Sequence, residues 1–245
     1  MLQKIPTQKP NLVIMPAGAN ASFQQWTDYN QHNFDLAVLQ WDDSDLLNTD
    51  DLAYYESASG QKWHLIGAFA QKFDLSDYEY IWCLDDDCIT TPENVALTFD
   101  FCKQHDLDLA QPGLAPGSYH SHAPTLQLPD SIMHITDTVE IMCPIFSQRV
   151  WAACNDCNLD MPWGIGYGLE GYWQGILGCS TGTTKFGGRV AVIDQLPVKH
   201  IKPVTQAHEY AAIGMDPNDD GMYFVNKGFG NWTFKTLEIL KNTLP

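Results

Sequence analysis

Apolar runs separated by polar breaks dominate the first 110 residues and predict buried strands. A short apolar run bounded by turn-forming residues is typical of a strand that is covered on both faces. Such runs occupy residues 11–17 (NLVIMPA), 34–40 (FDLAVLQ), 78–84 (YEYIWCL) and, more briefly, 107–110. We therefore expect these four segments to be strands.

Two helices are predicted between these strands. Around residues 62–73, Trp63, Ile66 and Phe73 recur at the spacing of one helical face. A second helix is expected after Thr90-Thr91-Pro92-Glu93, where a Thr caps the first turn, Pro suits its start and Glu follows three residues after Thr90. Strands that alternate with amphipathic helices indicate an α/β fold with a mostly parallel sheet.

The second half of the chain is less regular. Residues 113–130 are rich in Pro, Gly, Ser and His and predict a long loop, whereas residues 161–178 are dense in Gly and aromatic side chains. Strand-like segments lie within residues 134–146 (VEIMCPIF) and at residues 190–194 (VAVID). The tail, residues 232–242, predicts a closing helix. We find no internal repeat that would divide the 245 residues.

The net charge of −17, from 30 acidic and 13 basic residues, changes this picture by excluding partners. A nucleic acid requires a basic surface, and an anionic membrane repels a chain of this charge. A phosphate-bearing substrate would need positive charge supplied locally. A divalent cation is the obvious source.

The seven cysteines are scattered, and no secretory signal precedes them. Free thiols in a reducing cytoplasm are the simplest interpretation, so we expect a cytoplasmic protein. No stretch of about 20 apolar residues is present, so no membrane span is expected. Cys154 and Cys157 form a single CxxC without a second ligand pair, which favours a structural or incidental role over zinc or redox use.

Three consecutive carboxylates, Asp85, Asp86 and Asp87, end the strand over residues 78–84. Because side chains alternate along a strand, Asp85 and Asp87 are expected on one face and Asp86 on the other. Two carboxylates on one side suit Mg²⁺ or Mn²⁺, with diphosphate oxygens completing the shell. The alternative is a solvated turn before the next helix. The buried strand that precedes the triplet favours the metal.

Three further ionisable side chains are candidates for the chemistry. His200 follows the late strand, and an imidazole suits Mn²⁺ as a third ligand. Glu140 lies in an otherwise apolar predicted strand, and Glu170 lies among glycines and aromatic residues that let a sugar ring approach. Either carboxylate is a candidate general base for an acceptor hydroxyl. The alternative is a packing role for His200 and a structural hydrogen bond for each glutamate.

Other enzyme classes lack support, because GxSxG, P-loop, dinucleotide and HExxH motifs are absent. The chain does carry an ordered series of segments from about residue 11 to residue 204. These are a Lys-Trp helix, YxYIWxxDDDxxxxxEN, LxLAQPxL, SYHSH, VEIMxPIFS, GxGLExxW and VxVIDxxPVKH. In this order they resemble the glycosyltransferase-like family known as domain of unknown function 707. The resemblance implies a GT-A-like nucleotide-diphospho-sugar transferase fold, a three-layer sandwich around a mostly parallel sheet.

The resemblance also suggests roles for individual positions. It carries the acidic triplet onto Asp85, Asp86 and Asp87, and the late Asp and His of the family onto Asp194 and His200. Glu170 stands where the family usually has Asp, which adds one methylene to the candidate base. The residues expected to contact the nucleotide sugar, including two aspartates after the second strand, are Pro16, Ala17, Gly18, Asp42, Asp43, Lys62, Asp86 and Gln111.

Together these arguments predict a metal-dependent glycosyltransferase made of one domain over residues 1–245. Residues 11–110 would bind the nucleotide, and residues 111–245 the acceptor. Asp85, Asp87 and His200 would hold Mn²⁺ or Mg²⁺, while Glu170 or Glu140 would be the base. The expected partners are a nucleotide-diphosphate sugar and a carbohydrate or other hydroxyl acceptor. The alternatives are a non-catalytic carbohydrate- or nucleotide-binding protein on the same fold, and a metal-dependent phosphoesterase.

Overall fold

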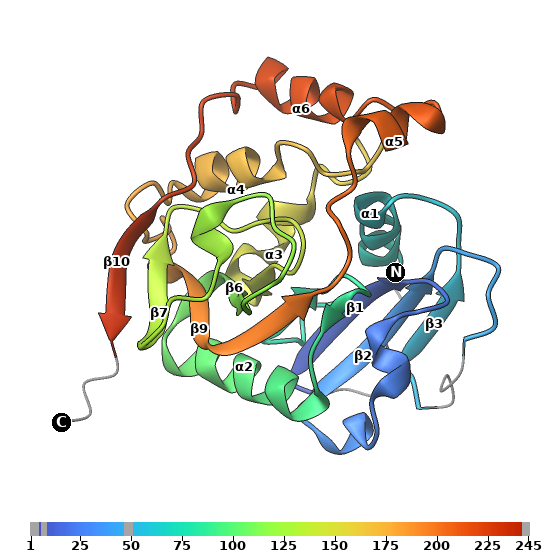
Figure 1. Ribbon diagram of the computed structural model, residues 1–245, viewed down its shortest axis with the longest axis horizontal. Helices are drawn as coiled ribbons and strands as arrows, with labels where there is room; N and C mark the ends of the chain where they lie inside the picture. The colour runs from blue at the N-terminus through green and yellow to red at the C-terminus, as the bar shows by residue number, and fades with distance from the viewer. Residues whose placement is uncertain (1–4, 6–8, 47–50, 242–245) are drawn as a thin grey trace.

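The computed structural model describes residues 5, 9–46 and 51–241 (Figure 1). Its strands are β1 (Asn11–Ala17), β2 (Phe34–Gln40), β3 (Tyr54–Ser57), β4 (Tyr80–Cys83), β5 (Cys88–Ile89), β6 (Leu107–Leu114), β7 (Ser131–Thr136), β8 (Ile145–Ser147), β9 (Arg189–His200) and β10 (Thr236–Lys241). Its α-helices are α1 (Lys62–Lys72), α2 (Pro92–Gln104), α3 (Gln148–Asn155), α4 (Leu169–Leu177), α5 (Ala207–Ala212) and α6 (Pro217–Asn226). Short 3₁₀ turns occupy Ser22–Gln25, Tyr29–Gln31 and Ala123–Thr125.

The strands form one sheet in the order β10-β7-β9-β6-β8-β4-β1-β2-β3, with β5 paired to β9 outside this path. The pairs β3·β2, β2·β1, β1·β4 and β6·β9 are parallel. Two strands run against this direction: β8 lies antiparallel between β4 and β6, and β7 lies antiparallel between β9 and β10. All the other strands on the path point the same way. The mixed α/β class with a mostly parallel sheet is confirmed.

Both faces of the sheet are covered, which gives three layers. In β1, Leu12 and Ile14 belong to one buried cluster, whereas Val13 and Met15 belong to the other. This alternation is the period of two of a strand, so a strand buried on both faces is apolar throughout. The first cluster includes residues of α1, α3 and α4, and the second includes residues of α2.

The start of α2 follows from its capping sequence. Thr91 is the N-cap, and its hydroxyl accepts a hydrogen bond from the backbone N–H of Asn94 at 3.2 Å. Pro92 occupies the first turn, where it removes no hydrogen bond that the helix needs. The sequence thus predicts the place where this helix begins.

Residues 137–144 do not form the strand that the sequence suggested. β7 ends at Thr136 and β8 begins at Ile145, and Glu140 lies in the connection. The order β7-β9-β6-β8 supplies the reason, because the chain must pass two strands before it joins the sheet again. The prediction that Glu140 belongs to a strand is therefore wrong.

The helix predicted over residues 232–242 is also wrong. The described part of this segment contains β10 (Thr236–Lys241), which pairs antiparallel with β7, and residue 242 lies outside the described residues. Leu, Glu and Lys are good helix formers, but the unpaired edge of β7 offers backbone hydrogen bonds that local preference does not foresee. None of the described helices is both long and apolar enough to cross a bilayer.

Candidate active site

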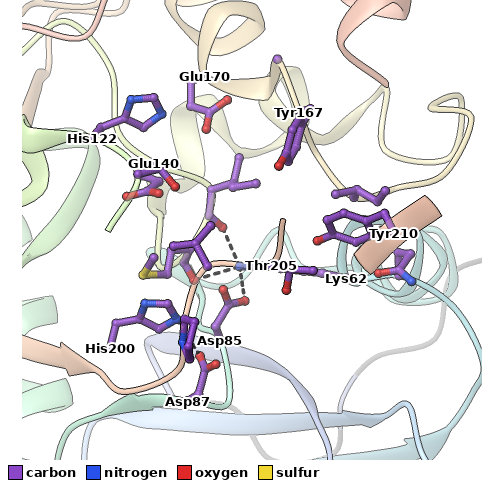
Figure 2. Close-up of a pocket in the computed structure, with 18 of the residues that line it drawn as sticks. Lys62, Asp85, Asp87, His122, Glu140, Tyr167, Glu170, His200, Thr205 and Tyr210 are labelled. Atoms are coloured by element: carbon purple, nitrogen blue, oxygen red, sulfur yellow. Dashed lines mark hydrogen bonds and ion pairs between the residues drawn. The ribbon is translucent and has the colours of Figure 1, made fainter. Parts of the chain in front are cut away.

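A cavity of about 460 Å³ opens beyond the carboxyl ends of β4 and β9 (Figure 2). Its ionisable lining residues are Lys62, Asp85, Asp87, His122, Glu140, Glu170 and His200, and its aromatic lining residues include Tyr167, Tyr210 and Trp232. These side chains come from segments far apart in the sequence. Ligands of open α/β sheets bind at this edge.

The acidic triplet lies in a turn directly after β4, where the N–H of Cys88 donates to the carbonyl oxygen of Asp85 at 3.2 Å. Asp85 and Asp87 line the cavity. Asp86 is not part of the lining and instead accepts a hydrogen bond from the backbone N–H of Gly18 at 2.8 Å. The middle carboxylate therefore fixes the loop after β1, while the outer two face the site.

Lys62, at the start of α1, holds Asp85 by an ion pair of 2.6 Å between Nζ and Oδ1. The same ammonium donates to the carbonyl oxygens of Ile141 at 2.6 Å and Met142 at 2.9 Å, as the dashed lines in Figure 2 show. An ammonium has three N–H groups, and three acceptors surround this one. Burial, opposed by the charge of Lys62, raises the pKa of Asp85 to about 6.

His200 is placed beside Asp87 by the pairing of β9 with β5, in which it lies opposite Cys88. Its Nδ1 lies 2.9 Å from the carbonyl oxygen of Tyr119, and because a carbonyl can only accept, Nδ1 carries a proton. Its Nε2 then faces Oδ1 of Asp87 at 3.3 Å. Burial opposes the change, but the hydrogen bond and charge of His200 lower the pKa of Asp87.

The donor set suits a divalent cation that a ligand helps to hold. An imidazole that donates through one nitrogen to a backbone carbonyl and presents the other is the usual arrangement of a metal-binding histidine. Within the described ranges, no group of three or more His, Cys, Asp and Glu side chains is arranged to hold a metal by itself. Mg²⁺ commonly uses one or two carboxylates and takes its remaining ligands from phosphate and water. Asp85, Asp87 and His200 fit a site of this type, in which phosphate and water complete the coordination of the cation.

Glu140 and Glu170 line the cavity away from the acidic turn, and only 3% and 5% of their surfaces are exposed. Gln111 positions Glu140, because its Oε1 accepts the backbone N–H of Glu140 at 2.7 Å. The Oε2 atom of Glu140 is buried without a hydrogen-bond partner. A buried polar atom without a partner is costly, so this oxygen is prepared to meet a donor on a ligand.

Burial raises the pKa values of both glutamates. The pKa of Glu170 rises to about 8, with the negative charge of Glu140 contributing. For Glu140, burial exceeds the opposing effect of hydrogen bonds from Ser121, and its pKa is also raised. With a pKa of about 8, Glu170 is mostly protonated at neutral pH.

The outer side of the cavity is formed by residues 201–235, which we call the C-terminal cover. It contributes Pro203, Thr205, Tyr210 and Trp232, and Figure 1 shows its helices α5 and α6 beyond α4. The rings of Tyr210 and Tyr167 meet edge to face with centroids 6.4 Å apart. The position of His200 before Lys202 and Pro203 predicts that the start of this segment folds back over the site, whereas no local pattern indicates Tyr210 or Trp232.

A fully buried carboxylate ties the C-terminal cover to the loop over residues 163–166, which precedes Tyr167. Asp220 in α6 accepts backbone N–H groups of Trp163 at 2.8 Å, Ile165 at 2.7 Å and Gly166 at 3.0 Å. Gly166 has φ of 105°, and a Cβ there would lie 2.5 Å from the ring of Trp63. Only glycine suits this position, so the loop that leads to Tyr167 and Glu170 is closely defined.

The remaining predicted residues lie at the same edge of the sheet without lining the cavity. Pro16 and Ala17 end β1, and Gly18 follows them. Asp42 accepts the N–H of Ala19 at 2.9 Å, and a hydrogen bond from Ser44 lowers its pKa to about 2. Asp43 is exposed. The structure therefore joins this group to the acidic turn through the Gly18–Asp86 hydrogen bond.

No protein-family model matches the chain, and no curated protein sequence matches it either. Solved structures do match. The crystal structure of S. aureus TarS aligns with 89% of this chain and 43% of TarS, with a TM-score of 0.53 and 10% identity. TarS 1–349 aligns with 77% of this chain and 59% of that chain, with a TM-score of 0.50 and 11% identity. The complex of TarS 1–349 with UDP-GlcNAc aligns with 89% of this chain and 72% of that chain, with a TM-score of 0.48 and 11% identity.

This chain thus corresponds to only part of the first two matched structures. At such low identity the similarity concerns the fold alone, and it agrees with the expected GT-A-like fold.

Proposed function

We propose that the chain is a glycosyltransferase that transfers a sugar from a nucleotide-diphosphate sugar to a hydroxyl acceptor with the help of a divalent cation. The glycosyltransferase-like fold supports the reaction class. One observation carries the proposal. The candidate ligands Asp85, Asp87 and His200 share a cavity with Glu140, whose buried Oε2 has no partner.

Asp85, Asp87 and His200 would hold Mn²⁺ or Mg²⁺, which, when bound, would act as a Lewis acid that neutralises charge on the leaving diphosphate. The loop at Pro16, Ala17 and Gly18, with the aspartates after β2, would bind the nucleotide. Lys62 keeps Asp85 and the loop that carries Glu140 at a fixed separation, so it is a positioning residue and not a direct contact to phosphate.

Glu140 is the favoured base of the two glutamates. Glu140 lines the cavity and its buried Oε2 has no hydrogen-bond partner, and its carboxylate would take the proton of the acceptor hydroxyl as the acceptor oxygen bonds to the anomeric carbon. The bond between that carbon and the diphosphate oxygen breaks, and the diphosphate leaves with the electron pair. Glu170, whose pKa is about 8, would be mostly protonated at neutral pH and would act as a neutral hydrogen-bonding group.

The test is donor binding and donor consumption with and without a cation. A panel of nucleotide sugars that includes UDP-GlcNAc should raise the melting temperature in Mn²⁺ and raise it less in EDTA. Asp87→Ala should abolish donor consumption while the far-UV circular dichroism remains unchanged. Asp100→Ala, at an exposed position of α2, is the matched control.

Two results would count against the proposal. Unchanged donor consumption by Asp87→Ala would remove the metal assignment. Binding of a nucleotide sugar without transfer or hydrolysis under any condition would favour the non-catalytic binding protein.

A further inference from the structure

The ionisable groups of the cavity divide into two ends. Figure 2 shows Asp85, Asp87 and His200 together at one end, with Glu140, Glu170 and His122 at the other. The first end suits a cation that carries a diphosphate. The second end has a different composition, and its chemistry restricts what can enter.

Among the described residues, no Lys or Arg side chain is free to pair with an anion at the second end. Lys62 is the only Lys or Arg that lines the cavity in the described part of the chain, and its three N–H groups are taken by Asp85 and two carbonyl oxygens. Burial, with the charge of His120, lowers the pKa of His122, so that imidazole is neutral at pH 7. A phosphate or carboxylate placed here would meet carboxyl groups and no compensating cation.

The second end offers hydrogen-bond acceptors beside aromatic rings. The unpartnered Oε2 of Glu140 requires a donor, and the hydroxyl groups of a ligand would supply one. Trp232 and Tyr167 line the same space, and the ring of Trp232 lies edge to face with His122 at 5.8 Å between centroids. An apolar ring face combined with peripheral hydroxyls matches such a lining.

We propose that the part of the cavity bounded by Glu140, Glu170 and Trp232 accepts an uncharged, hydroxyl-rich ring and rejects rings that carry phosphate or carboxylate. This inference rests on the proposed function, because it concerns the sugar handled at the same site. The ring can come from two sources, the donor or the acceptor. Like charges at close range in a partly buried site cost enough to exclude an anionic ring from either source.

Matched ligand pairs test the inference for each source. For the donor, UDP-glucose and UDP-glucuronic acid differ only at C6, and titration calorimetry in Mn²⁺ compares their affinities. For the acceptor, saturation-transfer NMR compares glucose with glucose 6-phosphate in the presence of UDP and Mn²⁺. In at least one pair, we expect the neutral member to bind at least about tenfold more tightly than the charged member. This corresponds to a difference in binding free energy of about 1.4 kcal/mol.

Glu140→Gln provides the second measurement, because it removes a charge and keeps the shape. The variant should bind the charged member of the responding pair more tightly than the wild type does, and so narrow the preference. A general loss of structure in the variant would instead weaken the binding of both members of the pair. Equal or tighter binding of the charged member by the wild type would overturn the inference, and so would a preference that Glu140→Gln leaves unchanged.

The same experiments separate this inference from the proposed function. Selective binding of neutral rings without donor consumption would support the inference and contradict the proposed glycosyltransferase activity. Transfer that proceeds equally well with charged and neutral rings would support the proposed activity and contradict the inference. If no member of either pair binds, the inference is wrong, and the panel of nucleotide sugars decides the proposed function.

Discussion

Lys62 Nζ lies 2.6 Å from Asp85 Oδ1, and this ion pair joins the start of α1 to the turn after β4. Because the ammonium also binds the carbonyl oxygens of Ile141 and Met142, it connects the two walls of the cavity. The side chains are only 15% and 30% exposed, so water replaces these contacts poorly. The geometry of the site therefore depends on this one side chain.

Lys62→Met should lower the free energy of unfolding by about 2 kcal/mol or more, since it leaves a half-buried carboxylate and two carbonyl oxygens without their donor. Urea unfolding measures the change. Lys103→Met is the control, because the Lys103–Glu79 pair has the same 2.6 Å separation but is exposed, and its loss should cost less than about 1 kcal/mol. Equal effects in the two variants would contradict the structural role of Lys62.

Glu170 should make the folded state less stable as pH rises. Its pKa is raised from 4.5 to about 8 by burial, so between these values the folded protein holds a proton that the unfolded chain releases. Stability then falls with increasing pH across this window, by up to about 1.4 kcal/mol per pH unit. Glu170→Gln should flatten this decline in urea unfolding measured from pH 5 to pH 8.

Glu93→Gln is the control for that measurement. The pKa of Glu93 is lowered by hydrogen bonds to its own backbone N–H and to Thr91, so its contribution is lost only as pH falls below about 4.5, outside the window. A Glu170→Gln variant with the same slope as the wild type would show that Glu170 is ionised throughout.

Asp220→Asn should loosen the loop that leads to Tyr167. The carboxylate is fully buried and accepts hydrogen bonds from three backbone N–H groups, and an amide cannot accept all of them. We therefore expect the free energy of unfolding to fall by about 2 kcal/mol or more. Asp219→Asn is the adjacent control, because Asp219 is exposed and its side chain accepts from Trp163 Nε1. Urea unfolding of both variants should separate them, and equal stabilities would contradict this assignment.

The cysteines should be unreactive in the native protein. All seven are free and buried, and burial raises the pKa of Cys83 and of Cys157, each to about 12. Ellman's reagent should therefore detect no fast-reacting thiol before denaturation and seven afterwards. A native thiol that reacts at once would show that one of these residues is accessible.

The parallel core was predictable because its signal is local. A strand that is buried on both faces must be apolar throughout, so β1 and β2 are visible in the sequence with their observed bounds. The acidic turn was equally visible, because Asp85 and Asp87 follow such a strand directly. Polar residues that end a buried strand lie at the ligand-binding edge of the sheet.

The rest of the site depends on contacts between distant residues. Lys62 was expected to assist phosphate binding, but nothing near it in sequence indicates Asp85 or Met142 as partners. Tyr210 and Trp232 reach the cavity only because β10 pairs with β7 and α6 anchors at Asp220. The helix-forming residues around position 236 predicted a helix there, whereas the structure has the strand β10.

The C-terminal cover is held at Asp220 and at Lys235, and it is lightly packed around α5, which precedes both attachments. Asp220 holds α6, and Asp137 accepts the N–H of Lys235 at 2.7 Å, whereas α5 has no buried side chain. A chain built in this way can exchange the residues that face a substrate without disturbing its parallel core. Selection for a new ligand would thus find its least constrained positions around Thr205 and Tyr210, and directed evolution would do well to begin there.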